Sequence, residues 1–107
     1  MKPYRNFKPE LIKHLKEAGA ASDYLTLAFE EGDKELFLLA LKDVVEARGG
    51  MTKLAKTTKL NREHLYRILS RRGNPEIYTL ETILEALGLH FAVLPTPSSK
   101  SKLRKAA

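Results

Sequence analysis

The sequence contains no cysteine and no tryptophan, and aromatic residues make up only 7% of its 107 residues. The lack of cysteine excludes disulfide bonds, thiolate metal sites and a cysteine nucleophile. The longest uninterrupted apolar run, residues 36–41, is far shorter than the roughly 20 residues of a membrane-spanning helix. Residues 1–5 lead into no apolar stretch of the kind that a secretory signal requires. These absences favour a cytoplasmic protein with no membrane segment.

The composition is that of a globular protein, and its charge is unevenly distributed around a formal net charge of +6. Residues 1–47 carry seven basic and nine acidic groups, and residues 76–95 carry three acidic groups and no lysine or arginine. Residues 48–75, which we call the basic block, carry eight basic groups and one acidic group, a net charge of +7. Such a block attracts a polyanion to one face. A solvated helical face is the alternative interpretation of any charge run.

Apolar residues recur at helical spacing through most of the chain, which predicts an all-α fold, a compact bundle of about five helices. We expect N-terminal helices within residues 8–32, a core helix at 33–48, a helix pair within 50–72 and a last helix at 79–88. Asp33 and Asn61 are the expected N-caps of the core helix and of the second helix of the pair. Residues 4–7 are short and can be extended.

The C-terminal part of the chain changes character after the last predicted helix. Residues 90–94 are β-prone, and we expect a short C-terminal β-strand there, paired either with a second copy of the chain or with residues 4–7. Residues 1–95 then make a single domain. The stretch 96–107 contains four basic residues among proline, serine and alanine and is expected to be a disordered tail. Two roles for it stay open: it either adds non-specific affinity for phosphate or has no function.

The basic block holds the two short helices of the pair, joined by about three residues, and this spacing is typical of a helix-turn-helix. In that motif the second helix enters the major groove of DNA with its N-terminal end first. The outward face of the second helix supplies the candidate base-reading residues, which are Arg62, Glu63, Tyr66 and Arg67. Arginine can donate two hydrogen bonds to guanine, and glutamate can accept one from the amino group of cytosine.

A second set of residues around the same helices is suited to phosphate contacts, which position a protein on DNA without reading its sequence. Lysine, arginine, hydroxyl and amide side chains make such contacts, and so do the backbone amides at the start of a helix. The candidate phosphate contacts are Met51, Lys53, Lys56, Asn61, Ser70, Arg71 and Arg72.

Catalytic and metal chemistry find little support in the sequence. His14, His64 and His90 lie in three separate segments, and none has a second ligand at zinc-binding spacing on the same helix face. No glycine-rich phosphate loop and no nucleophile elbow occur. We therefore expect no catalytic residue, no metal and no cofactor.

Several of these segments together resemble the lambda-repressor-like helix-turn-helix proteins. They are residues 54–55 (Leu-Ala), 61–67 (Asn-Arg-Glu-His-Leu-Tyr-Arg), 69–70 (Leu-Ser), 73–75 (Gly-Asn-Pro), 79–80 (Thr-Leu) and 86–89 (Ala-Leu-Gly-Leu). Residues 23–25, 29–33, 39–41 and 47–49 extend the likeness to a narrower family, the addiction-module antidote proteins (antitoxins) that are paired with RelE-like toxins. The resemblance covers roughly residues 20–95.

The resemblance implies a five-helix DNA-binding domain in a bacterial protein that dimerises, binds the operator of its own promoter and neutralises a RelE-like toxin, with no enzymatic activity. The chain departs from the family at Lys59, near a position where the family usually has glycine in a left-handed conformation. A lysine that keeps this conformation costs on the order of 1 kcal/mol.

Two rival functions stay open. One is a repressor-type transcriptional regulator that has no toxin partner. The other is a protein-interaction module that only occludes a basic toxin, for which the acidic balance of residues 1–47 is suited by charge complementarity.

Overall fold

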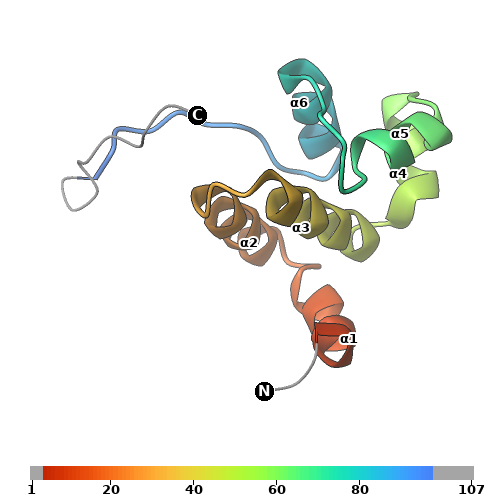
Figure 1. Ribbon diagram of the computed structural model, residues 1–107. Helices are drawn as coiled ribbons and strands as arrows, with labels where there is room; N and C mark the ends of the chain where they lie inside the picture. The colour runs from red at the N-terminus through yellow and green to blue at the C-terminus, as the bar shows by residue number, and fades with distance from the viewer. Residues whose placement is uncertain (1–3, 98–107) are drawn as a thin grey trace.

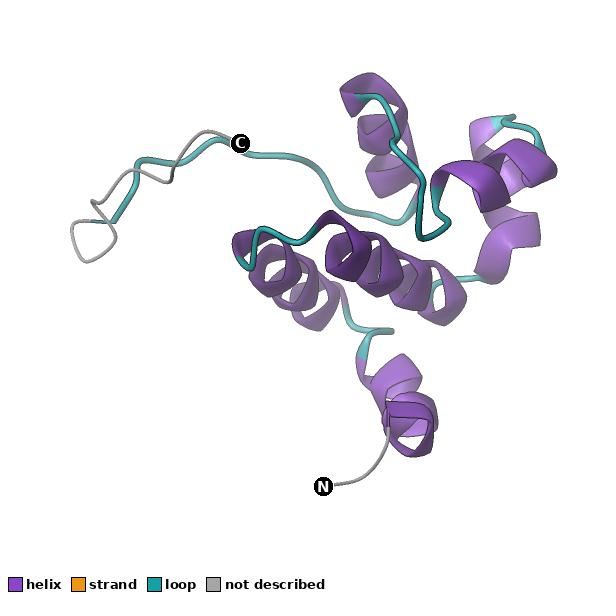
Figure 2. Cartoon of the chain, viewed as in Figure 1, coloured by secondary structure: helices purple, strands orange, loops and turns teal. Residues whose placement is uncertain are grey.

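The structure is a computed structural model that describes residues 4–97, with side chains from Phe7 onward. Its elements are six α-helices: α1 (Tyr4–His14), α2 (Ala18–Glu30), α3 (Lys34–Ala47), α4 (Gly50–Thr58), α5 (Arg62–Ile68) and α6 (Ile77–Ala86). Figures 1 and 2 show these helices packed around α3, with the chain leaving the bundle after α6. No helix within residues 4–97 combines the length and the apolar character needed to cross a membrane.

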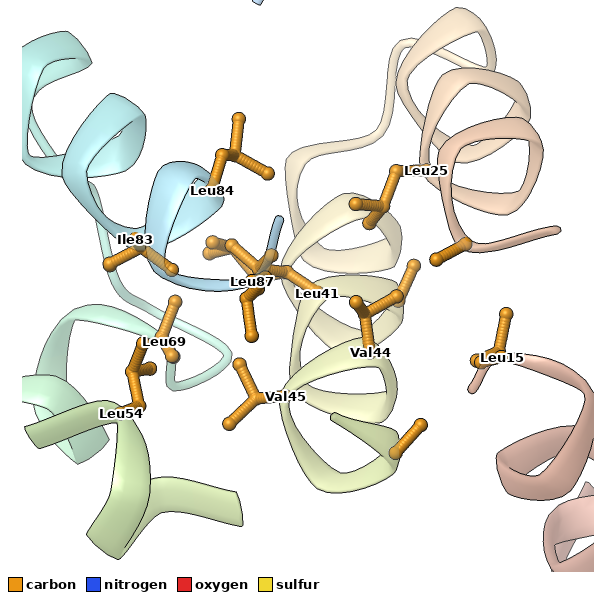
Figure 3. Packing of buried hydrophobic residues seen from close by; sticks show 14 of the residues in the cluster. Leu15, Leu25, Leu41, Val44, Val45, Leu54, Leu69, Ile83, Leu84 and Leu87 are labelled. Atoms are coloured by element: carbon orange, nitrogen blue, oxygen red, sulfur yellow. The ribbon is translucent and has the colours of Figure 1, made fainter. Parts of the chain in front are cut away.

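The central helix is α3, which has α1 and α2 on one side and α4–α6 on the other (Figures 1 and 3). Apolar residues cover more than half of its circumference, so it buries side chains toward both groups of helices. Leu41, Val44 and Val45 lie between Leu15 and Leu25 on one side and the cluster from α4–α6 on the other, as Figure 3 shows. The cluster from α4–α6 includes Leu54, Leu69, Ile83, Leu84 and Leu87.

The expected all-α bundle is correct, but the expected C-terminal strand at residues 90–94 is wrong. Residues 89–97 form neither helix nor strand, and the described part of the chain, residues 4–97, contains no strand at all. A strand needs a ladder partner for its N–H and C=O groups, and residues 4–7, one of the two proposed partners, belong to α1. Val93 and Leu94 are 100% and 78% exposed, so no packing holds this run in place either.

The N-terminal part of the chain also differs from what was expected, both in where its first helix begins and in the total number of helices. Residues 4–7 are helical rather than extended, so α1 begins at Tyr4 and has Pro9 in its interior. A sharp break at residues 15–17 separates α1 from α2, so the described chain has six helices. Most of the expected tail, residues 96–107, lies outside the described residues, which end at residue 97.

Two of the helix starts follow the predicted caps. The side chain of Asp33 accepts a hydrogen bond from the backbone N–H of Leu36 at 3.2 Å, and that of Asn61 accepts one from the N–H of His64 at 3.1 Å. Both confirm the predicted N-caps, because each satisfies an amide that has no partner inside the helix. The last helix begins at Ile77 rather than at residue 79 and has no side-chain cap.

One polar pair joins α2 to α3. The Tyr24 hydroxyl donates a hydrogen bond to the buried Asp43 carboxylate at 2.9 Å. Burial raises the pKa of Tyr24 above its ordinary value of 10, and the bond to Asp43 adds to the rise. Tyr24 therefore stays a neutral donor that helps to satisfy the buried carboxylate.

Candidate nucleic-acid interface

The candidate interface is built on α4 and α5, which are joined by residues 59–61 and pack against each other. Leu54 of α4 and Leu65 of α5 are buried in the core, and Leu60 in the connection is partly buried beside them. These contacts anchor the inner sides of both helices, so their opposite sides face solvent. We call the two helices and their connection, residues 50–68, the α4–α5 pair.

The connection in the α4–α5 pair is held by backbone-directed hydrogen bonds and one unusual residue. Thr58 Oγ1 donates to the Leu54 carbonyl at 2.7 Å and accepts from the Leu60 N–H at 3.2 Å. Lys59 then adopts a left-handed conformation with φ 61° and ψ 19°, and it is the one non-glycine residue with positive φ among the described residues. A lysine therefore adopts the left-handed conformation that glycine usually adopts.

The four candidate base-reading residues lie on α5 as predicted, and all four are exposed while Leu65 points into the core. Two of them contact each other: the Arg62 guanidinium lies 5.6 Å from the centre of the Tyr66 ring, and Arg62 Nη2 lies 3.4 Å from the Tyr66 hydroxyl. A guanidinium over an aromatic face is weakly attracted to it. The contact therefore orients Arg62 along α5 without burying it.

The candidate phosphate residues differ in whether the side chain is exposed or already makes a contact within the chain. Lys53, Lys56 and Arg72 are exposed. The Met51 side chain packs partly against the core, so its candidate phosphate contact is its backbone N–H in the first turn of α4. The Asn61 side-chain oxygen is used by the cap. The Ser70 hydroxyl donates to the Arg67 carbonyl at 2.7 Å.

Comparison with known proteins assigns the chain to a family. Residues 6–95 match the family described as "Probable addiction module antidote protein". The chain belongs to this family. It is also 36% identical over 84 residues to an uncharacterized protein of Haemophilus influenzae, covering 78% of this chain and 86% of that protein. No solved structure matches the chain.

Arg71 of this antidote-family protein is paired within the chain. Its Nε lies 3.1 Å from Glu35 Oε2, and the two side chains are 82% and 54% exposed. An exposed pair of this kind contributes about 0–1 kcal/mol, so a phosphate can compete for Arg71. The pair places the C-terminal end of the basic block beside the start of α3. No sequence signal pointed to it, because the partners lie 36 positions apart.

Arg48 also belongs to the basic block by sequence, but the structure gives it an internal role. Its Nε donates to the Leu87 carbonyl at 2.6 Å and its Nη1 to the Lys16 carbonyl at 2.7 Å. The side chain thus connects the end of α3 with the end of α6 and with the chain between α1 and α2. One of the eight cations in the block is therefore a structural latch, which charge counting alone does not reveal.

A glycine closes the segment after α5. Gly73 is buried, and a Cβ atom there would collide with the carbonyl oxygen of Ile68. Only glycine lets the chain turn back so closely over the end of α5. Ser70, Arg71 and Arg72 lie in the short segment between the end of α5 and this turn.

No group of three or more histidine, aspartate or glutamate side chains among residues 4–97 is arranged to hold a metal ion. The expectations of no metal, no cofactor and no catalytic residue stay predictions.

Proposed function

We propose that this antidote-family protein is a cytoplasmic, non-enzymatic transcriptional repressor that binds its own operator as a dimer through the α4–α5 pair. It acts in a type II toxin–antitoxin module and neutralises a RelE-like toxin. In this proposal the pair is a helix-turn-helix of the lambda-repressor-like kind, and α5 is the recognition helix.

The observation that carries the DNA-binding part is the coincidence of geometry and charge at the α4–α5 pair. Arg62, Glu63, Tyr66 and Arg67 project to solvent from one short helix, inside a block of net charge +7. The block offers phosphate-binding groups around base-reading groups, which is the division of labour found in DNA readers. A solvated surface helix has no need of this arrangement.

The proposed dimer follows from how such motifs read DNA. Two α5 helices related by a two-fold axis would enter successive major grooves roughly 34 Å apart, on a nearly palindromic site. Light scattering at tens of micromolar protein tests this part, and a monomeric mass there would contradict it.

The first experiment compares binding of the purified protein to its own upstream DNA and to scrambled DNA at two salt concentrations. We expect a preference of about 10³-fold or more for the upstream DNA, with affinity that falls steeply as salt rises. Weak and equal binding to both DNAs would make the basic block a general cation and would contradict the repressor.

Two variants separate base reading from phosphate contact. Arg62→Ala should cost about 1–3 kcal/mol and relax specificity at one base position. Lys56→Ala is the matched control, because it removes a cation from α4 and should weaken binding to every sequence alike. An equal loss on all sequences for Arg62→Ala would make Arg62 a phosphate contact only.

The toxin part rests on membership of the antidote family and is tested by co-expression. The proposal expects a RelE-like reading frame next to the gene; expressed alone, it should arrest growth, and co-expression of this protein should restore growth. Selective operator binding without any such toxin would instead support a repressor that acts alone. Rescue without operator binding would support a module that only occludes the toxin.

A further inference from the structure

Helix α2 and its flanks form a strongly acidic stretch that no part of the DNA-binding proposal uses. Residues 17–33 contain no lysine or arginine and five acidic residues, a net charge of −5; the five are Glu17, Asp23, Glu30, Glu31 and Asp33. This charge contrasts with the +7 of the basic block in the same chain.

The same helix exposes two large apolar side chains. Only a narrow stripe of small and medium residues is buried on α2, and Leu27 and Phe29, on either side of that stripe, are 64% and 63% exposed. The buried residues are Ala21, Leu25 and Ala28. Exposed apolar side chains next to charged ones are a common feature of protein-interaction sites.

Leu27 lies among carboxylates on the helix surface. Asp23 is four positions before it, and Glu30 and Glu31 are three and four positions after it, so all three are its neighbours on one face. This arrangement is that of an apolar contact point with an acidic rim. A partner that covers Leu27 must also face these charges.

Phe29 is held in place on the other flank of α2. Its ring meets the ring of Phe37 edge to face, with the ring centres 5.6 Å apart and the planes at 81°. The contact fixes the orientation of an aromatic side chain that is still mostly exposed. A pre-oriented aromatic residue loses little conformational entropy when a partner covers it.

The position of α2 leaves it accessible while DNA is bound. It packs mainly against α3 and lies on the side of α3 opposite to α4–α6 (Figures 1 and 3). An occupant of the outer side of α2 therefore does not cover the exposed face of α5.

We propose that the exposed surface of α2, formed by Asp23, Leu27, Phe29, Glu30 and Glu31, is the docking surface for a basic protein partner. Because Leu27 and Phe29 lie on opposite flanks of α2, the partner encloses the exposed side of the helix, so that it buries both residues and places cations against the acidic rim. This inference rests on the proposed function, in which the basic partner is the RelE-like toxin, and it names the surface where that toxin binds.

Charge decides among the possible occupants. DNA is repelled by a stretch of net charge −5. A second copy of the chain docked through the same surface would place that charge against itself, because a two-fold interface brings identical patches together. A basic protein gains attraction instead of repulsion from every one of these carboxylates.

The experiment measures binding of the full-length chain to the purified product of the RelE-like reading frame that the proposed function expects beside its gene, by calorimetry and by association kinetics. Leu27→Ser and Phe29→Ser should each weaken binding at least tenfold, as expected for anchors inside an interface. The Asp23→Lys and Glu31→Lys double variant should slow association most at low salt. Thermal melts establish that each variant is folded. Phe29→Ser also removes the ring contact with Phe37, whereas Leu27→Ser leaves that contact in place.

The matched control lies on α6. Ile77→Ser removes an apolar side chain that is 65% exposed, close to the 64% of Leu27, and Glu76→Lys, at the N-cap of α6, with Glu85→Lys reverses two exposed charges. These variants should leave toxin affinity unchanged within about twofold. Equal loss at α2 and at α6 would show a general effect of surface charge or apolarity and would overturn the docking surface.

The outcomes separate this inference from the proposal on which it rests. Tight toxin binding that survives the α2 variants overturns the docking surface alone, while absence of binding by the wild-type chain overturns the toxin pairing as well. The basic residues at 100, 102, 104 and 105 are the rival occupant within the chain. Replacing all four with glutamine should leave toxin affinity unchanged, and tighter binding would show that they occupy α2 instead.

Discussion

Replacing Lys59 with glycine should make the protein more stable. Lys59 connects α4 to α5 in a left-handed conformation, with φ 61°, and this conformation costs a residue with a Cβ atom about 1–2 kcal/mol. Glycine removes that cost but gives the unfolded chain more freedom, which offsets about 0.5–1 kcal/mol. The net expectation for Lys59→Gly is a gain of about 0.5–1 kcal/mol.

The assay is thermal and urea unfolding of wild type, Lys59→Gly and Lys59→Ala. The gain expected for glycine corresponds to a rise in Tm of roughly 2–5 °C for a domain of this size. Lys59→Ala is the matched control, because it removes the same charge but keeps the Cβ atom and therefore the backbone strain. A melting temperature of Lys59→Gly at or below that of wild type, or an equal rise for alanine, would refute the reasoning.

The same two variants also test the place of Lys59 at the DNA interface. Lys59 is exposed and precedes the N-cap of α5 by two residues, which is at most about 7 Å of chain. If it contacts a phosphate, both variants should weaken DNA binding alike and reduce the salt slope by about 0.9. Glycine would then stabilise the fold while weakening DNA binding, whereas an unchanged salt slope would exclude the phosphate contact.

Three further perturbations follow from single contacts. Glu35→Gln should free Arg71 and tighten DNA binding by no more than about fivefold, since an exposed pair contributes about 0–1 kcal/mol; weaker binding in a filter or fluorescence assay would contradict this. Tyr24→Phe should cost about 1 kcal/mol in urea unfolding at pH 7 by removing the hydrogen bond to Asp43. The pKa of Tyr24 is raised in the fold, so wild type should lose this advantage as the pH rises above about 10, where the unfolded tyrosine ionises; a constant difference from pH 8 to 11 would contradict the raised pKa. Arg48→Lys should lower the free energy of unfolding by about 2–3 kcal/mol through the loss of a two-carbonyl contact, and a change below about 0.5 kcal/mol would show that the contact is not a latch.

Local chemistry made much of the fold predictable. The helical spacing of apolar residues identified α3 as the core helix, and the caps at Asp33 and Asn61 are correct because a cap depends on residues within one turn. The exposed face of α5 followed from the same periodicity, since Leu65 at the core sets the direction of Arg62 and Tyr66.

The errors arose where a segment depends on a partner that sequence does not specify. Residues 90–94 have the composition of a strand, but a strand forms only where another strand supplies its hydrogen bonds. Residues 4–97 contain no strand that could pair with them. Residues 4–7 were open to either interpretation, and the start of α1 includes them.

The sequence by itself determined the separation of charge into an acidic N-terminal half and a basic block, and the helices that carry each. Only the tertiary structure decided which cations of that block remain available. Arg48 is engaged by the carbonyls of Leu87 and Lys16, and Arg71 lies against Glu35. All three contacts join positions more than 30 residues apart, and charge counting carries no information about such distances. Helix packing brings these groups together, so the number of free charges is a property of the fold.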